Sequence, residues 1–121
     1  MSFASWVKGL FSSRGKAISL YRSGMAKATK HDFHGAIADY SAAIQESHFP
    51  IDVKAMAIYN RALAYSAIHD DAKAIEDLES VLEMPGLPAN IKAFAEERRQ
   101  RIRQRCEKGA APTASRKLGY R

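Results

Sequence analysis

Two segments of this chain carry the same residue pattern at an offset of 38 positions. Residues 56–83 place small and apolar side chains at three- and four-residue steps on both sides of His69, the spacing of two amphipathic helices joined by a turn. Residues 20–46 repeat this pattern, with Gly24 in the place of Ala62 and His31 in the place of His69. A helix hairpin of this size cannot bury both its faces alone, so such repeats stack on one another. The repeat therefore predicts an all-α chain of two stacked hairpins.

The turn residues set the expected limits of the helices. We expect helices over residues 16–29, 33–47 and 52–68, a fourth that ends before the Pro-Gly-Leu-Pro stop at 85–88, and a fifth over 89–107. Aspartates precede or open three of them, so Asp32, Asp52 and either Asp70 or Asp71 are the expected N-caps. On the fourth helix Glu76, Asp77 and Glu79 are expected on the solvent side. The fifth helix has Ile91, Phe94, Ala95 and Ile102 toward one side and is expected to cap the second hairpin.

At 121 residues the chain has room for one domain with appendages. We expect an N-terminal arm over residues 1–15, a helical domain with a basic capping helix over 16–107, and a flexible basic tail over 108–121. The lone cysteine, Cys106, allows no internal disulfide and favours a reducing compartment.

The arm has an apolar stripe at helical spacing, followed by an expected hinge at residues 13–15. We consider two roles for the arm: docking on protein, either its own domain or a partner, and binding at a membrane surface, where Trp and Phe favour the headgroup boundary. Isolated helices below about 12–15 residues are marginal in water, so the arm is expected to be ordered only when docked. The stripe consists of Phe3, Trp6, Val7, Leu10 and Phe11.

The hairpins resemble the tetratricopeptide repeat (TPR) family. The resemblance rests on a small residue midway along the first helix, alanine early in the second helix, aromatic residues at set positions and a closing proline. It implies a short TPR-like solenoid of two hairpins plus a capping helix, in which the first helices line a concave groove for an extended or helical peptide. The residues that carry the resemblance are Gly24, Ala62, Tyr65, Ala36, Ala74, Tyr40, Ala43 and Pro85.

Carried over by position, the resemblance assigns a set of groove residues to each copy. Tyr and Arg are common interface anchors, and Asn60 matches the asparagine with which chaperone-tail-binding TPR domains hold a peptide backbone or carboxylate. The alternative is that several of these residues pack against the arm or the fifth helix. The set is Ile18, Tyr21, Arg22, Met25 and Thr29 from the first copy, and Met56, Tyr59, Asn60, Leu63 and Ser66 from the second.

Charge is segregated along the chain. Residues 31–97 carry twelve acidic and four basic residues, whereas residues 98–121 carry nine basic residues and one acidic residue. The basic end is expected to meet an acidic protein surface or an anionic membrane, or to be solvated; nucleic acid is disfavoured because no aromatic residues are interleaved for base stacking. The arginines concerned are Arg98, Arg99, Arg101, Arg103 and Arg105.

No catalytic constellation, metal site or cofactor motif is recognised; His31 and His34 flank a turn and are interpreted as surface residues. We expect a non-catalytic protein–protein interaction module, a scaffold, adaptor or accessory subunit, in the cytoplasm or at the cytoplasmic face of a membrane. The alternatives are a peripheral membrane adaptor anchored by residues 2–13 and the basic helix, and a nucleic-acid-associated factor. Two repeats are fewer than the three usually needed for stability, so the arm, self-association or a permanent partner is expected to supply further burial.

Overall fold

The computed structural model describes the backbone of residues 13–119 and the side chains of residues 14–109. Within these limits the protein is all-helical, as predicted, with five helices and no strand. The helices are α2 (Ser13–Thr29), α3 (Phe33–Ile44), α4 (Ile51–Ala67), α5 (Asp71–Glu83) and α6 (Ala89–Gly119).

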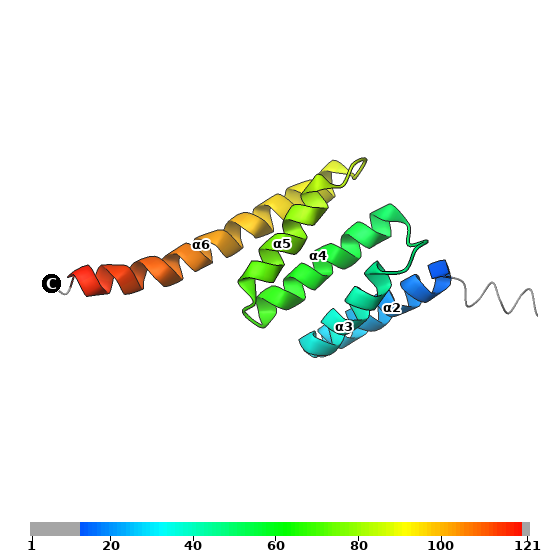
Figure 1. Ribbon diagram of the computed structural model, residues 1–121, viewed down its shortest axis with the longest axis horizontal. Coiled ribbons are helices and arrows are strands. Elements are labelled where there is room, and N and C mark those ends of the chain that lie inside the picture. Colours follow the sequence, from blue (N-terminus) through cyan, green and yellow to red (C-terminus); the bar gives the residue numbers. More distant parts are fainter. Residues whose placement is uncertain (1–12, 120–121) are drawn as a thin grey trace, which may run out of the picture.

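The helices form two antiparallel hairpins and a long final helix (Figure 1). α2 pairs with α3, α4 pairs with α5, and α3 packs against α4 to join the hairpins. α6 packs on α5 and touches α4, and its C-terminal half projects beyond the hairpins. We call α2, α4 and α6 the first helices, and α3 and α5 the second helices. The first helices all begin on the right-hand side of Figure 1, so their N-terminal ends share one end of the molecule.

The same turn closes both hairpins. His31 and His69 each adopt a positive φ of 64° after the end of a first helix. The backbone N–H of Asp32 donates to Lys27 O at 2.8 Å, and that of Asp70 donates to Tyr65 O at 2.9 Å, the six-residue closure of a Schellman motif. Asp32 caps α3 as predicted, and Asp70, one of the two predicted candidates, caps α5; each accepts from the backbone N–H three residues on.

The core consists of small side chains packed around a few large ones. Tyr40, Leu78 and Val81 are the largest fully buried side chains, and they stand among alanines with no exposed surface. Gly24 lies against the Tyr40 ring so closely that a Cβ there would sit 2.6 Å from Cε1. The small residue expected midway along the first helix is therefore required by the ring on the second helix.

Three helix limits differ from the prediction. α2 begins at Ser13, so residues 13–15 form its first turn and are not a hinge. α3 ends at Ile44 instead of residue 47, because the chain turns there to bury Phe49 beside Ala17 and Ala43. α6 continues to Gly119, past the predicted end at residue 107.

The prediction that Asp52 caps α4 is wrong. The N-cap is Pro50, whose backbone is extended and whose fixed φ suits a helix start. Asp52 lies in the first turn, where its carboxylate accepts from the N–H of Val53 at 2.9 Å. An acidic residue there still stabilises the helix N-terminus through the helix dipole.

Candidate functional site

A cavity of about 310 Å³ opens between the middle of α2 and the N-terminal ends of α4 and α6. Tyr21 comes from α2, Met56 from α4 and Ile91 from α6, so all three first helices contribute to it. Its lining is mainly apolar, and its one charged residue is Asp52, which is exposed. We refer to this cavity as the groove. Its lining residues are Tyr21, Asp52, Val53, Met56, Pro88 and Ile91.

Tyr21 is held in place from several sides. Asn60 Nδ2 donates to the Tyr21 hydroxyl oxygen at 3.0 Å, joining α2 to α4. The Tyr21 ring centroid lies 6.0 Å from that of Tyr40 and 6.4 Å from that of Phe49, within the range of aromatic pairs. Burial raises the pKa of the Tyr21 hydroxyl, while the hydrogen bond from Asn60 lowers it. The neutral phenol therefore presents a fixed ring face at the groove.

The predicted groove residues fall into three groups. Tyr21 and Met56 line the groove, and Asn60 supports it through Tyr21. Arg22 is exposed on α2, and Met25 is half-buried. Tyr59 packs against the core of the second hairpin, and Leu63 is half-buried. The amide N–H of Asn60, expected to hold a peptide, is engaged by Tyr21.

Asp52, Val53, Pro88 and Ile91 were not predicted to line the groove, although the repeat carries the signal for one of them. Ile91 stands 38 positions after Val53, and the residues that follow, Lys92-Ala93-Phe94, match Lys54-Ala55-Met56. α6 is thus a third copy of the first helix, which extends the repeat beyond the two copies recognised from sequence. Phe94, the counterpart of Met56, is 51 % exposed.

The arginines of α6 largely face acids of the same chain. Arg99 and Arg103 both pair with Glu79 of α5, at 3.9 and 2.6 Å, and Arg105 pairs with Asp71. Arg101 pairs with Glu97 on α6 itself, at 3.6 Å, while Arg98 is half-buried. Three of the five arginines thus help to dock α6 on α5, and their charge is partly neutralised within the molecule.

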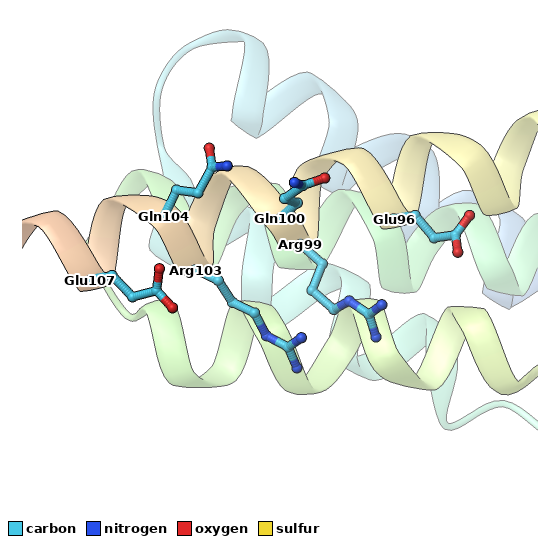
Figure 2. A pocket seen from close by; sticks show the side chains of 6 residues that line it. All are labelled: Glu96, Arg99, Gln100, Arg103, Gln104 and Glu107. Carbon is cyan, nitrogen blue, oxygen red and sulfur yellow. The ribbon is translucent and has the colours of Figure 1, made fainter.

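A second cavity, of about 430 Å³, runs along α6 (Figure 2). Arg99 and Arg103 point from α6 toward the neighbouring helix, whereas Gln100 and Gln104 point the other way. The lining alternates carboxylates, guanidinium groups and amides, and it contains no hydroxyl, thiol or imidazole that could act as a nucleophile or base. All its residues come from this one helix: Glu96, Arg99, Gln100, Arg103, Gln104 and Glu107.

The prediction that Asp77 faces solvent is wrong. Asp77 is 5 % exposed, and Arg61 of α4 binds it through two hydrogen bonds, Nε at 2.8 Å and Nη2 at 2.7 Å. Nη1 of Arg61 also donates to Ser41 of α3 at 3.0 Å, so one guanidinium joins three helices. The hydrogen bonds to Asp77 raise the pKa of Arg61. The repeat contains a signal for this role, because an aspartate, Asp39, also stands at the equivalent position of the first copy. In the structure Asp39 likewise accepts a hydrogen bond from the first helix, from Ser23 at 2.6 Å. Of its neighbours, Glu76 is exposed as predicted, and Glu79 is half-buried against the arginines.

Cys106 is exposed, and its Sγ donates to Asp71 Oδ2 at 3.3 Å. This hydrogen bond raises the pKa of the thiol and so disfavours the reactive thiolate. Among residues 13–119, no group of three or more His, Cys, Asp or Glu side chains is arranged to hold a metal ion. His31, His34 and His69 are exposed at or beside the turns, as interpreted from the sequence.

No helix in the described part of the chain is long and apolar enough to cross a bilayer. The arm residues Phe3, Trp6, Val7, Leu10 and Phe11 lie outside the described residues.

In comparisons with known proteins, no family model, curated protein or solved structure matches the chain.

Proposed function

We propose that this chain is a non-catalytic interaction module of the TPR type, which binds a segment of a partner protein in the groove. The proposal includes a cytoplasmic location, for which the single cysteine is the argument. The module would act as a scaffold, an adaptor or an accessory subunit of a larger assembly.

The observation that carries the proposal is the position of the groove. It opens between the middle of α2 and the N-terminal ends of α4 and α6, so a bound segment contacts all three helices at once. The cavity volume is at the lower end of the range for ligand pockets, about 300–1,000 Å³, which suits one or two anchoring side chains better than a whole cofactor. Met56 and the fixed Tyr21 ring provide an adaptable and a rigid contact, respectively.

The chemistry of the lining indicates the kind of segment. Val53, Met56, Pro88 and Ile91 favour an apolar or aromatic anchor, and the carboxylate of Asp52 at the edge favours a basic residue beside it. Phe94, half exposed on α6, extends the apolar surface beyond the cavity. An apolar residue flanked by Lys or Arg is the expected signature of the bound segment.

The test is site-specific photocrosslinking of the full chain in cells that express it. A photoreactive amino acid replaces Met56 in the groove or, as a matched control, Ala42, which is exposed on α3 away from the groove. We expect adducts to one partner segment from position 56 and not from position 42. Mass spectrometry then identifies the segment.

A synthetic peptide of that segment is titrated into the wild-type chain, Met56→Arg and Ala42→Arg. A contact at the centre of an interface contributes about 2 kcal/mol or more, so Met56→Arg is expected to weaken binding by roughly 30-fold. Ala42→Arg is expected to bind like the wild type. Equal affinities for all three chains, or the same adducts from both crosslinking positions, would refute a groove-bound partner.

A further inference from the structure

Each second helix covers the same stripe on the first helix that follows it. On α4 the stripe is Ala57, Arg61 and Ala64; both alanines are buried, and Arg61 donates to Ser41 of α3. On α6 the residues 38 positions later are Ala95, Arg99 and Ile102. Ala95 and Ile102 are again buried, and Arg99 pairs with Glu79 of α5, which is the counterpart of Ser41. The contact between successive hairpins therefore repeats residue by residue.

On α2 the same stripe is uncovered. Its residues are Ser19, Ser23 and Ala26, 38 positions before those of α4, and all three are exposed. Beside them Leu20 is half-buried, whereas its counterpart Ile58 is only 7 % exposed. We call Ser19, Leu20, Ser23 and Ala26 the outer face of α2. Within this face Ser23 donates to Asp39 of α3 at 2.6 Å and Leu20 packs partly against the core, whereas no described helix covers Ser19 and Ala26, which are exposed.

The residues just before α2 match those just before α4 and α6. Trp6 stands 38 positions before Ile44, and Phe11 stands 38 positions before Phe49. Ile44 packs against the cores of both hairpins, and Phe49 is 8 % exposed. One period further on, Leu82 packs against the second core and Leu87 is 9 % exposed. The two positions that join successive hairpins are thus occupied by aromatic residues in the segment that precedes α2.

We propose that residues 2–11, the counterparts of residues 40–49, cover the outer face of α2 as the C-terminal end of α3 and the connection after it cover α4. α2, α4 and α6 begin at Ser13, Ile51 and Ala89, which are 38 positions apart. Trp6 therefore stands as far before α2 as Ile44 stands before α4 and Leu82 before α6. In this register Phe3 is the counterpart of Ser41 and lies over Ser23, while Trp6 lies toward Leu20. Each buried aromatic side chain removes about 150–250 Å² from water, so burial of Phe3, Trp6 and Phe11 together contributes toward the entropy cost of ordering the segment. The groove stays open, so this proposal holds whether or not the groove binds a partner.

Trp6 is the only tryptophan, so its fluorescence reports this contact in the full chain. Ser19→Arg combined with Ala26→Arg places two large charged side chains on the outer face. The matched control is Ala38→Arg combined with Ala42→Arg, two exposed positions of α3. Met56→Arg tests the groove as an alternative docking site. A synthetic peptide of residues 1–12 defines the emission maximum and the quenching constant of a solvated Trp6, and far-UV circular dichroism checks that each variant is folded.

We expect a blue-shifted, quencher-protected Trp6 in the wild type, in the α3 control and in Met56→Arg. The outer-face variant is expected to shift the emission maximum and the quenching constant to the values of the peptide. Phe3→Ser, which leaves the described helices unchanged, is expected to shift the emission maximum and the quenching constant of Trp6 part of the way toward the values of the peptide. This second variant keeps the test decisive if the outer-face variant does not fold.

Four results would overturn the proposal. A solvated Trp6 in the wild type means that the segment is not docked. Release by Met56→Arg but not by the outer-face variant places it in the groove. Burial that disappears on dilution, with a matching change of mass in light scattering, assigns it to a second copy. Burial only after addition of anionic lipid vesicles assigns it to a membrane surface.

Discussion

At the scale of single residues, Gly24 shows why the repeat needs a small side chain midway along its first helix. The Tyr40 ring, 1 % exposed, fills the space that a Cβ would need. Ala62 occupies this position in the second copy, where Leu78 replaces the tyrosine, so side-chain sizes on the two helices are matched.

Gly24→Ala is therefore expected to destabilise the fold. Alanine gains about 1 kcal/mol of helix propensity over glycine, but forcing an extra carbon against a buried ring costs about 1–3 kcal/mol. Because the Cβ would lie 2.6 Å from the ring, we expect the upper part of this range and a net loss of about 1–2 kcal/mol. Urea unfolding of Gly24→Ala and of Gly24→Ala combined with Tyr40→Leu checks this; failure of the smaller partner to recover stability would contradict the packing argument.

Substitution of the turn histidines, His31 and His69, is expected to stabilise the fold, unlike Gly24→Ala. The left-handed conformation costs a non-glycine residue about 1–2 kcal/mol, and glycine relieves it at a smaller cost in unfolded-chain entropy. His69→Gly is expected to raise the free energy of unfolding by about 0.5–1 kcal/mol. His31→Gly is expected to gain less, because the His31 ring also makes an edge contact with Phe33, at 5.6 Å between centroids. Thermal unfolding of both variants tests this order, and an equal or reversed gain would contradict it.

At the scale of helices, the Arg61–Asp77 pair joins α4, α5 and α3. Removing one partner of a buried pair leaves the other charge unpaired, which costs about 3–5 kcal/mol. Asp77→Ala is expected to lose that much stability in urea unfolding, whereas Glu76→Ala, at the exposed neighbouring position, is expected to change it by less than about 0.5 kcal/mol. Replacing both Arg61 and Asp77 by leucine is expected to recover part of the loss; a small effect of Asp77→Ala would show that the pair contributes little.

The helices also show how far the sequence was informative. The 38-residue repeat predicted the hairpins and their turns, and the sequence predicted the cap Asp32 and narrowed the second cap to Asp70 or Asp71, because these depend on local spacing. Asp77 was misplaced because an acidic residue on a helix looks solvent-facing until its partner on another helix is known. The groove was predicted only in part, since Tyr21 and Met56 are among the residues that the TPR resemblance assigns to it, while Pro88 depends on how α6 lies beside α4.

At the scale of the whole molecule, a buried tyrosine makes the free energy of unfolding depend on pH in the alkaline range. Burial first, and then the proximity of Tyr21 and Asp39, raises the pKa of Tyr40 from 10.0 to about 12. Between these values the unfolded chain loses the proton and the folded chain keeps it, so the folded state becomes less stable as pH rises.

We expect the free energy of unfolding to fall above pH 10 and this decline to end near pH 12, with a slope of at most about 1.4 kcal/mol per pH unit from this group. Tyr40→Phe is expected to flatten the decline and to leave the smaller contribution of Tyr21, whose pKa is also raised by burial. Urea unfolding at a series of pH values measures the slope. An unchanged slope in Tyr40→Phe would show that another group controls alkaline unfolding.

The repeat register also bears on how genes for such chains change length. Residues 51–88 contain one first helix, one second helix and the connection to α6. The residue after this block, Ala89, begins α6 just as Ile51 begins α4, so the block is one full repeat. An in-frame duplication of these 38 codons would therefore join equivalent surfaces without a new junction. A unit inserted after α6 would not fit in the same way. A second helix packs closely on a first helix at Gly24 and Ala62, but the larger Gln100 stands at this position of α6. We expect natural length variants to differ by whole units inserted ahead of α6.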